Sequence, residues 1–177
     1  MPPREVGEIV VRPLLPFGFM SGYDGQPDKT VDAWRNLWFH TGDAGWMDET
    51  GCVTFVDRIK DCIRRRGENI SSFEVEACIS KLDGVAEVAA FAVPADGDGT
   101  EDEVMLAVVA VEGQKLDPAW VFEAAKKLLP AFASPRYIEI IDDLPRTETE
   151  RVQKAKLRQR GVTESTWDWD LHPSGPG

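Results

Sequence analysis

SSFEVEACISKLDGVAEVAAFAVP, residues 71–94, is the stretch that decides the fold of this protein. Its first half predicts an amphipathic helix, because Ser71 and Glu74 have the spacing of a capping box, which satisfies free backbone N–H groups at a helix start. The apolar residues that follow at helical spacing are Val75, Cys78, Ile79 and Leu82. Residues 85–94 are a short apolar run typical of a buried strand. Helix followed directly by buried strand predicts a layer of helix on sheet.

Further along the chain the same two patterns recur. Residues 103–111 and 136–142 are apolar runs that indicate two more strands. Between them, residues 117–129 predict a helix, because it begins with Asp-Pro, a favoured N-cap followed by the residue best suited to the first helical position. A short helix is expected around residues 154–158. The chain therefore alternates strands and helices over most of its second half.

These elements predict an α+β domain over residues 60–165, a small mixed sheet covered by helices on one side. Residues 1–59 are a β-rich piece with too few strands to be a domain. The last segment, residues 166–177, is expected to be a disordered tail. A junction between two bodies is therefore expected at residues 58–61.

The β-rich piece has its own local signals. VGEIVVRP, residues 6–13, alternates and predicts a strand that ends at Pro13. A loop rich in Gly and Pro and a short helix near residues 31–34 follow it. Three strands are then expected, separated by a tight turn at Thr41-Gly42-Asp43 and a hairpin at residues 48–51. CIRRRGEN, residues 62–69, predicts another short strand that ends at the glycine.

Positive charge is concentrated in two stretches of an acidic chain. The formal net charge is −11, yet residues 57–66 carry five Lys or Arg against two Asp, and residues 146–160 carry six against two Glu. Such clustering suits a small polyanion, such as a nucleotide or a phosphorylated cofactor, if the two stretches meet in space. The acidic remainder argues against nucleic acid. The alternative is that both stretches are solvated charged faces.

Composition excludes several other classes. The 177 residues, 42% of them hydrophobic and 29% charged, are typical of a globular protein. No apolar run approaches the about 20 residues that span a bilayer, and we expect a cytoplasmic protein without a signal peptide. Three cysteines without metal-binding spacing predict reduced, mostly buried thiols. The acidic turn with Asp96, Asp98 and Asp102 lacks the ligand spacing of a calcium loop, so we expect no metal site.

Three motifs then occur in a fixed order: WFHTGD at residues 38–43, GCVTFVDRIKDCIRRRGENISSFEVE at residues 51–76, and LPRTETERVQKAKLR at residues 144–158. Together they resemble the C-terminal third of the acyl-adenylate-forming (AMP-binding) enzyme superfamily, which includes acyl-CoA synthetases. Two looser segments, PFGFMSGY and TERVQK, are similar to the branch of carnitine and crotonobetaine CoA ligases. The resemblance implies an ATP-dependent acyl-CoA ligase that makes an acyl-adenylate and transfers the acyl group to CoA.

The resemblance also implies roles for single residues. Asp43 takes the place of an aspartate that accepts hydrogen bonds from both ribose hydroxyls of ATP, for which two acceptor oxygens are suited. Arg58 takes the place of an arginine that reaches the nucleotide, although a surface ion pair with Asp57 or Asp61 is an alternative. Lys60 takes the place of the hinge about which the C-terminal domain swings between two half-reactions.

CoA and the catalytic lysine are implied further along. The loop at Gly67 resembles a segment that lines the pantetheine tunnel, and Arg64 and Arg66 are candidates for binding CoA phosphates. The family pattern PKTxxGKI places Glu150 where glycine is expected and Arg151 where the catalytic lysine is expected. Lys154 is a second candidate for that lysine's role.

The chain has no phosphate loop and no acyl pocket, which in this superfamily lie in an N-terminal domain of about 350 residues. We therefore expect the chain to be inactive alone and to need that domain in cis or in trans. Mg²⁺ is expected for the full enzyme but not on these residues. Two alternatives stay open: a non-catalytic nucleotide-binding or CoA-binding module derived from this fold, and an interaction domain whose cationic stretches bind an acidic protein.

Overall fold

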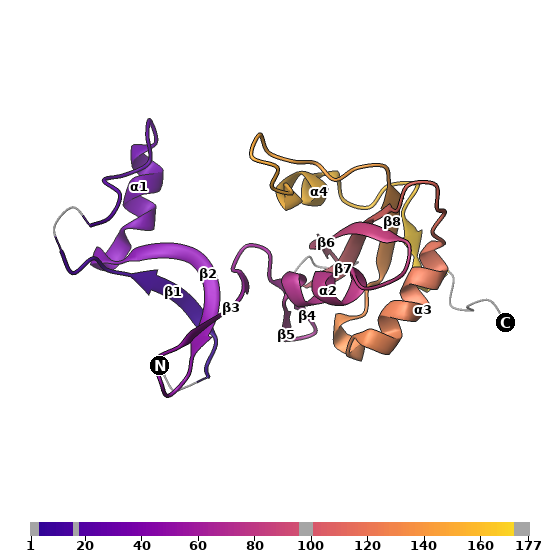
Figure 1. Ribbon diagram of the computed structural model, residues 1–177, viewed down its shortest axis with the longest axis horizontal. Coiled ribbons are helices and arrows are strands. Elements are labelled where there is room, and N and C mark those ends of the chain that lie inside the picture. Colours follow the sequence, from indigo (N-terminus) through magenta and orange to yellow (C-terminus); the bar gives the residue numbers. More distant parts are fainter. Residues whose placement is uncertain (1–3, 16–17, 96–100, 172–177) are drawn as a thin grey trace. The chain divides into compact units, whose positions relative to one another are not determined.

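A computed structural model describes residues 4–15, 18–95 and 101–171 of the protein. The chain divides into two compact units, residues 1–60 and residues 61–177 (Figure 1). Each unit is built around its own sheet, and the two are described separately below. The calcium alternative at Asp96 and Asp98 lies outside the described residues.

The first unit is a three-stranded antiparallel sheet in the order β1-β2-β3. Its strands are β1 (Gly7–Val11), β2 (Phe39–Met47) and β3 (Val53–Arg58), and β2 and β3 are joined by the expected hairpin, in which Gly51 N donates to Asp48 O. Helix α1 (Pro27–Ala33) is longer than the predicted segment near residues 31–34, because Pro27 starts the helix four residues earlier. A 3₁₀ turn, η1 (Arg35–Leu37), leads into β2.

The predicted tight turn at residues 41–43 is wrong. β2 passes through these residues without reversing direction, and Gly42 adopts a φ of 73°, in the left-handed region that favours glycine. Opposite it, the pairing of β1 with β2 shifts register between Glu8 and Val10, as at a β-bulge. Local turn signals in the sequence therefore mark a kink inside a long strand, not its end.

The second unit contains a four-stranded sheet in the order β6-β7-β8-β9. β6 (Val85–Pro94) and β7 (Asp102–Ala110) are antiparallel, β8 (Tyr137–Ile141) runs parallel to β7, and the short β9 (Trp167–Asp168) is antiparallel to β8. Helix α3 (Pro118–Leu128) provides the crossover that a parallel connection requires, and a 3₁₀ turn, η2 (Ala131–Ala133), follows it. The mixed sheet with helices confirms the predicted α+β class.

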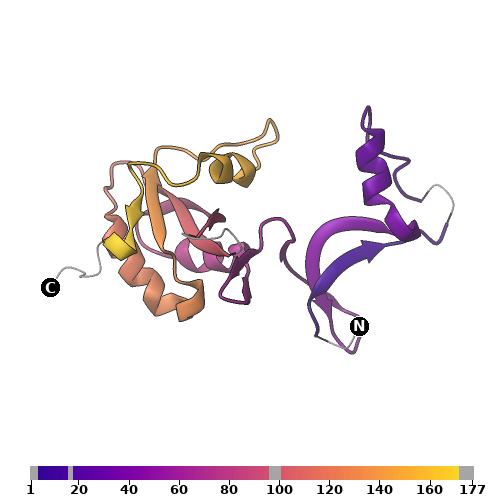
Figure 2. The same cartoon turned by 180° about the vertical axis from the view of Figure 1, so that it is seen from behind.

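Helices lie on both faces of this sheet, not on one face as expected. α2 (Ser72–Ile79), with Ser71 as the predicted N-cap, packs with α3 over one face. α4 (Lys154–Arg160) packs over the other face (Figures 1 and 2). There Leu157 joins Phe91 and Met105 in a second core. The physical reason is that β6 and β7 are apolar on both sides, so each face needs a cover.

The expected disordered tail is also partly ordered. Residues 167–171 form β9 and a 3₁₀ turn, η3 (Trp169–Leu171). The Trp169 ring stacks on Phe122 of α3 with centroids 4.2 Å apart, and Arg136 forms an ion pair with Asp168. Two tryptophans are enough apolar surface to hold a short terminal segment against a helix.

Candidate functional site

In the first unit, Asp43 and Arg58 are direct cross-strand partners on β2 and β3. The Arg58 Nε lies 2.8 Å from the Asp43 Oδ1, and the side chains are 57% and 28% exposed, so solvent reaches both. Of the two expected alternative partners, Asp57 is buried and accepts from the backbone N–H of Arg58, and Asp61 pairs with Arg158. The sheet therefore presents a carboxylate and a guanidinium side by side.

The kink of β2 holds Asp43 in place. The backbone N–H of Asp43 donates to Thr41 Oγ1, and Thr41 Oγ1 donates in turn to Ile9 O on β1. Gly42 is fixed on both sides, since its N–H donates to Glu8 Oε1 and its carbonyl accepts from the N–H of Ile59. These bonds leave the backbone at Asp43 little freedom.

Glu8 supports this kink and was not singled out from the sequence. Its second oxygen lies 2.6 Å from His40 Nδ1, and 3.3 Å from Arg35 Nη2. Partial burial opposes ionisation, but the contacts with His40, Gly42 and Arg35 outweigh it and lower the pKa of Glu8. Nothing local in the sequence could reveal this role, because Glu8 and Gly42 are 34 positions apart.

Lys60, the predicted hinge, is exposed and is the last residue of the first compact unit. The second unit then opens with a hairpin of β4 (Ile63–Arg65) and β5 (Glu68–Ile70). Its two-residue turn has positive φ at both positions, 52° at Arg66 and 79° at Gly67, as a type I′ turn requires. The positive φ of the second turn position therefore explains the glycine at residue 67.

The three consecutive arginines of this hairpin differ in burial. Arg64 and Arg66 are exposed, whereas Arg65 is buried and lies 2.7 Å from Glu103. Arg65 also donates to the carbonyls of Phe132 and Ser134. Burial lowers its pKa, and Glu103 partly offsets that effect. Arg65 is therefore held in place by other groups of the protein, while Arg64 and Arg66 are the exposed arginines of the hairpin.

A cavity of about 340 Å³ lies beside this hairpin, inside the second unit. Four cationic side chains and two aromatic rings line it, together with Glu103 and Asp170; they are Arg65, Arg66, Lys126, Arg136, Phe122 and Trp169. Of these cations only Arg66 was singled out from the sequence, because the four come from three separate segments without a shared motif. Its chemistry suits an anion that also carries a flat ring.

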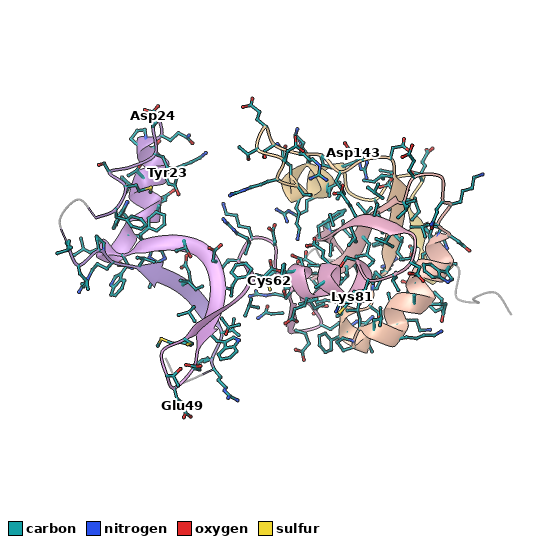
Figure 3. The ribbon with its side chains drawn as sticks, viewed as in Figure 1. Tyr23, Asp24, Glu49, Cys62, Lys81 and Asp143 are labelled. Atoms are coloured by element: carbon teal, nitrogen blue, oxygen red, sulfur yellow. The ribbon has the colours of Figure 1, made fainter. Side chains whose placement is uncertain are left out.

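The third motif forms a narrow loop between β8 and α4, just after Asp143, which Figure 3 labels. Arg146 and Val152 make an antiparallel bridge across it, and Thr147 N–H donates to Arg151 O. Glu150 has a φ of 61°, so this glutamate adopts the conformation of the glycine that the family pattern has here. Arg151 is exposed at the base of this turn.

Four of the six cationic side chains in residues 146–160 form ion pairs with other residues of the second unit. The pairs are Arg146 with Glu87, Lys154 with Glu76, Arg158 with Asp61, and Arg160 with Glu139. Among the residues that the structure describes, Arg151 and Lys156 are the two cations of the stretch that form no ion pair. The positive charge of this stretch therefore serves mainly to hold the second unit together. Lys154 is already paired with Glu76, whereas a catalytic cation needs a free charged group.

Comparison with known proteins agrees with this architecture. Residues 74–151 match the family model of the AMP-binding enzyme C-terminal domain. The chain contains an AMP-binding enzyme C-terminal domain. It is 41% identical over 84% of its length to a probable CoA ligase, CCL9, of Humulus lupulus, and 34% identical over 89% to the crotonobetaine/carnitine–CoA ligase of Salmonella arizonae. Its fold matches ATP-bound MatB from Rhodopseudomonas palustris with a TM-score of 0.77, at 34% identity over 90% of this chain and 31% of that one.

The chain is short beside these relatives. It spans 27% of the Humulus ligase and 30% of the Salmonella ligase. In the described part of the chain, no helix is long and apolar enough to cross a membrane, and no cluster of three or more His, Cys, Asp or Glu could hold a metal ion. No disulfide joins the three cysteines, all of which the structure describes, and Cys52 is exposed, contrary to the expectation of mostly buried thiols.

Proposed function

We propose that this chain is the C-terminal part of an ATP-dependent acyl-CoA ligase. The observation that carries the proposal is the Asp43–Arg58 pair, which the kinked strand β2 holds rigidly and leaves open to solvent. Support comes from the relatives, which are named as CoA ligases, and from the ATP-bound structure with the same fold.

The first half-reaction joins the carboxylate substrate to ATP. A carboxylate oxygen attacks the α-phosphorus, the bond to the β-phosphate oxygen breaks, and pyrophosphate leaves with its electron pair. Asp43 accepts hydrogen bonds from the ribose hydroxyls, and Arg58 binds nearby oxygens. Arg151, carried in by rotation about Lys60, neutralises charge between the two anions, and such preorganised charge is the largest catalytic term in reactions of this kind.

The second half-reaction transfers the acyl group to CoA. The sulfur of the CoA thiolate attacks the acyl carbonyl carbon, and the bond to the AMP oxygen breaks, which releases AMP. The turn at Gly67 lies along the pantetheine arm of CoA, and Arg64 and Arg66 bind the phosphates of CoA. The neighbouring cavity is lined by Lys126 and two aromatic rings, and its volume and positive charge suit the nucleotide portion of CoA.

The rest of the catalytic machinery belongs to the N-terminal part that the longer relatives have. That part supplies the phosphate loop, the acyl pocket and the site for Mg²⁺, either in the same polypeptide or as a separate subunit. The 177-residue chain alone is therefore expected to form no acyl-adenylate.

A chimera tests the proposal. The chain is joined to the N-terminal remainder of the Salmonella ligase and assayed with carnitine and ATP for pyrophosphate release, and separately for thioester formation from supplied acyl-adenylate. We expect both reactions. Arg151→Ala is expected to lower pyrophosphate release by about 10²–10³-fold, the usual effect of losing one charge-stabilising donor, while thioester formation from supplied acyl-adenylate continues. Arg151→Lys is expected to keep or raise the rate of the first step.

Two results would contradict this function. One is a folded chimera that shows neither half-reaction while the parent Salmonella ligase is active in both. The other is ATP binding, measured by calorimetry, without turnover in the chimera and in its Arg151→Lys variant. The second result favours the alternative of a non-catalytic nucleotide-binding module. One observation supports that alternative, the presence of Glu150-Arg151 where the family pattern has Gly-Lys.

A further inference from the structure

Lys154 is the first residue of α4, three positions after Arg151, and it makes an enclosed contact with α2. Its ammonium lies 2.7 Å from Ser72 Oγ and 2.7 Å from Glu76 Oε1. Glu76 Oε1 also accepts a hydrogen bond from the backbone N–H of Ala90 on β6, at 2.8 Å. One charged group therefore joins α4, α2 and the central sheet.

This contact differs from an ordinary surface ion pair. The Lys154 side chain is 14% exposed and that of Glu76 is 21% exposed, and Ser72 is fully buried. Ion pairs on open surface contribute little, whereas removing one partner of an enclosed pair leaves the other charge unsolvated. Lys156, two residues later on the same helix, is exposed and is the natural comparison.

The position of Arg151 depends on its flanks. Within the described residues its side chain has no ion-pair partner, so no ion pair fixes the guanidinium and its position follows the loop backbone. On one side the loop is held by Arg146, which pairs with Glu87 on β6. On the other side, Val152 packs against the second core and bridges to Arg146, and the Gln153 N–H donates to Pro145 O. Lys154 then makes the first ion pair after Arg151, and it is the charged anchor of this flank.

We propose that Lys154, together with Ser72 and Glu76, is a positioning residue that fixes Arg151 for acyl-adenylate formation. The inference rests on the proposed function, because it assigns Lys154 a role in the same reaction. It also separates two lysines of one helix: Lys154 acts through the loop, and Lys156 has no part in it. A rate that depends on geometry is sensitive to such support, since a displacement of about 1 Å can cost about 10²-fold.

The test compares Lys154→Met with Lys156→Met in the same chimera, with melting temperature and both half-reactions measured. Lys154→Met is expected to lower pyrophosphate release by about 10–100-fold while thioester formation from supplied acyl-adenylate changes less than about twofold. Lys156→Met is expected to change neither rate. Lys154→Arg, which can still reach Glu76, is expected to restore most of the first rate.

Three results would overturn the inference. The first is that Lys154→Met leaves pyrophosphate release unchanged, and the second is that Lys156→Met lowers it equally. The third result is that Lys154→Met lowers both half-reactions together with the melting temperature and that Lys154→Arg restores stability without restoring the first rate, which shows a purely structural lysine. If the unsubstituted chimera is inactive, the proposed function itself has failed, and this outcome is distinct from all three.

Discussion

Glu150 is the residue at which the third motif departs most from its family pattern. Its φ of 61° lies in the left-handed region, which costs a residue with a Cβ about 1–2 kcal/mol. Its side chain is 83% exposed and lies 3.8 Å from Arg146, a distance at which a surface pair contributes little. The chain therefore keeps a glycine conformation without glycine, and places a carboxylate next to Arg151.

Replacing Glu150 by glycine is expected to speed acyl-adenylate formation several-fold. The substitution relieves the backbone strain and removes a negative charge that repels ATP near Arg151. The charge contribution should disappear at high salt, because both groups are exposed. Pyrophosphate release by the chimera at low and high salt measures the effect.

Glu148→Gln is the matched control for Glu150. Glu148 is exposed on the same loop and has an ordinary backbone conformation, so this variant removes the same charge without changing strain. An equal gain from both variants at low salt would mean that only charge matters. No gain from Glu150→Gly at any salt concentration would contradict the account of the loop.

At the scale of elements, local signals predicted the helices and strands of the second unit well. The capping box at Ser71, the Asp117 N-cap and the apolar runs of β6 and β7 act within a few residues, so the sequence shows them directly. The kink in β2 and the anchoring of α4 could not be predicted. They depend on partners far away in sequence, such as Glu8 for Gly42 and Glu76 for Lys154.

The link between β1 and β2 through Glu8 is expected to depend on pH. The pKa of Glu8 is lowered in the folded protein, so its ionised form stabilises the kink above about pH 4.3, the usual glutamate value, and this contribution is lost as the pH falls through the lowered pKa. Glu8→Gln is therefore expected to lower the hydrogen-exchange protection of the Gly42 amide about fivefold near pH 7, since a charged acceptor is replaced by a neutral one.

The difference in hydrogen-exchange protection between the unsubstituted protein and Glu8→Gln should vanish at pH values below the lowered pKa, where Glu8 is itself neutral. Exchange of residues 39–47, measured as protection factors from pH 3 to pH 7, gives this profile. Glu49→Gln is the control, because Glu49 is an exposed carboxylate at the β2–β3 hairpin of the same unit, as Figure 3 shows. A pH-independent effect of Glu8→Gln would rule out the charge as its cause.

At the scale of the whole molecule, the two units differ in how well they bury apolar surface. Both core clusters lie entirely in the second unit. The sheet of the first unit leaves large apolar side chains in solvent, among them Val10, Met47, Val53 and Phe55, whose exposed fractions are 37–57%. A patch of this kind normally packs against another surface, and the longer relatives have the polypeptide to provide it.

We therefore expect the isolated 177-residue chain to self-associate, whereas residues 61–177 alone stay monomeric. Association should strengthen with salt, because screening weakens the repulsion between chains of net charge −11 while the apolar attraction persists. Light scattering over a range of concentrations measures it. Val53→Thr with Phe55→Lys is expected to reduce association of the whole chain, and Phe132→Lys, an equally exposed aromatic of the second unit, is expected to leave it unchanged. If residues 61–177 self-associate as strongly as the whole chain, the surface that mediates association lies in the second unit instead.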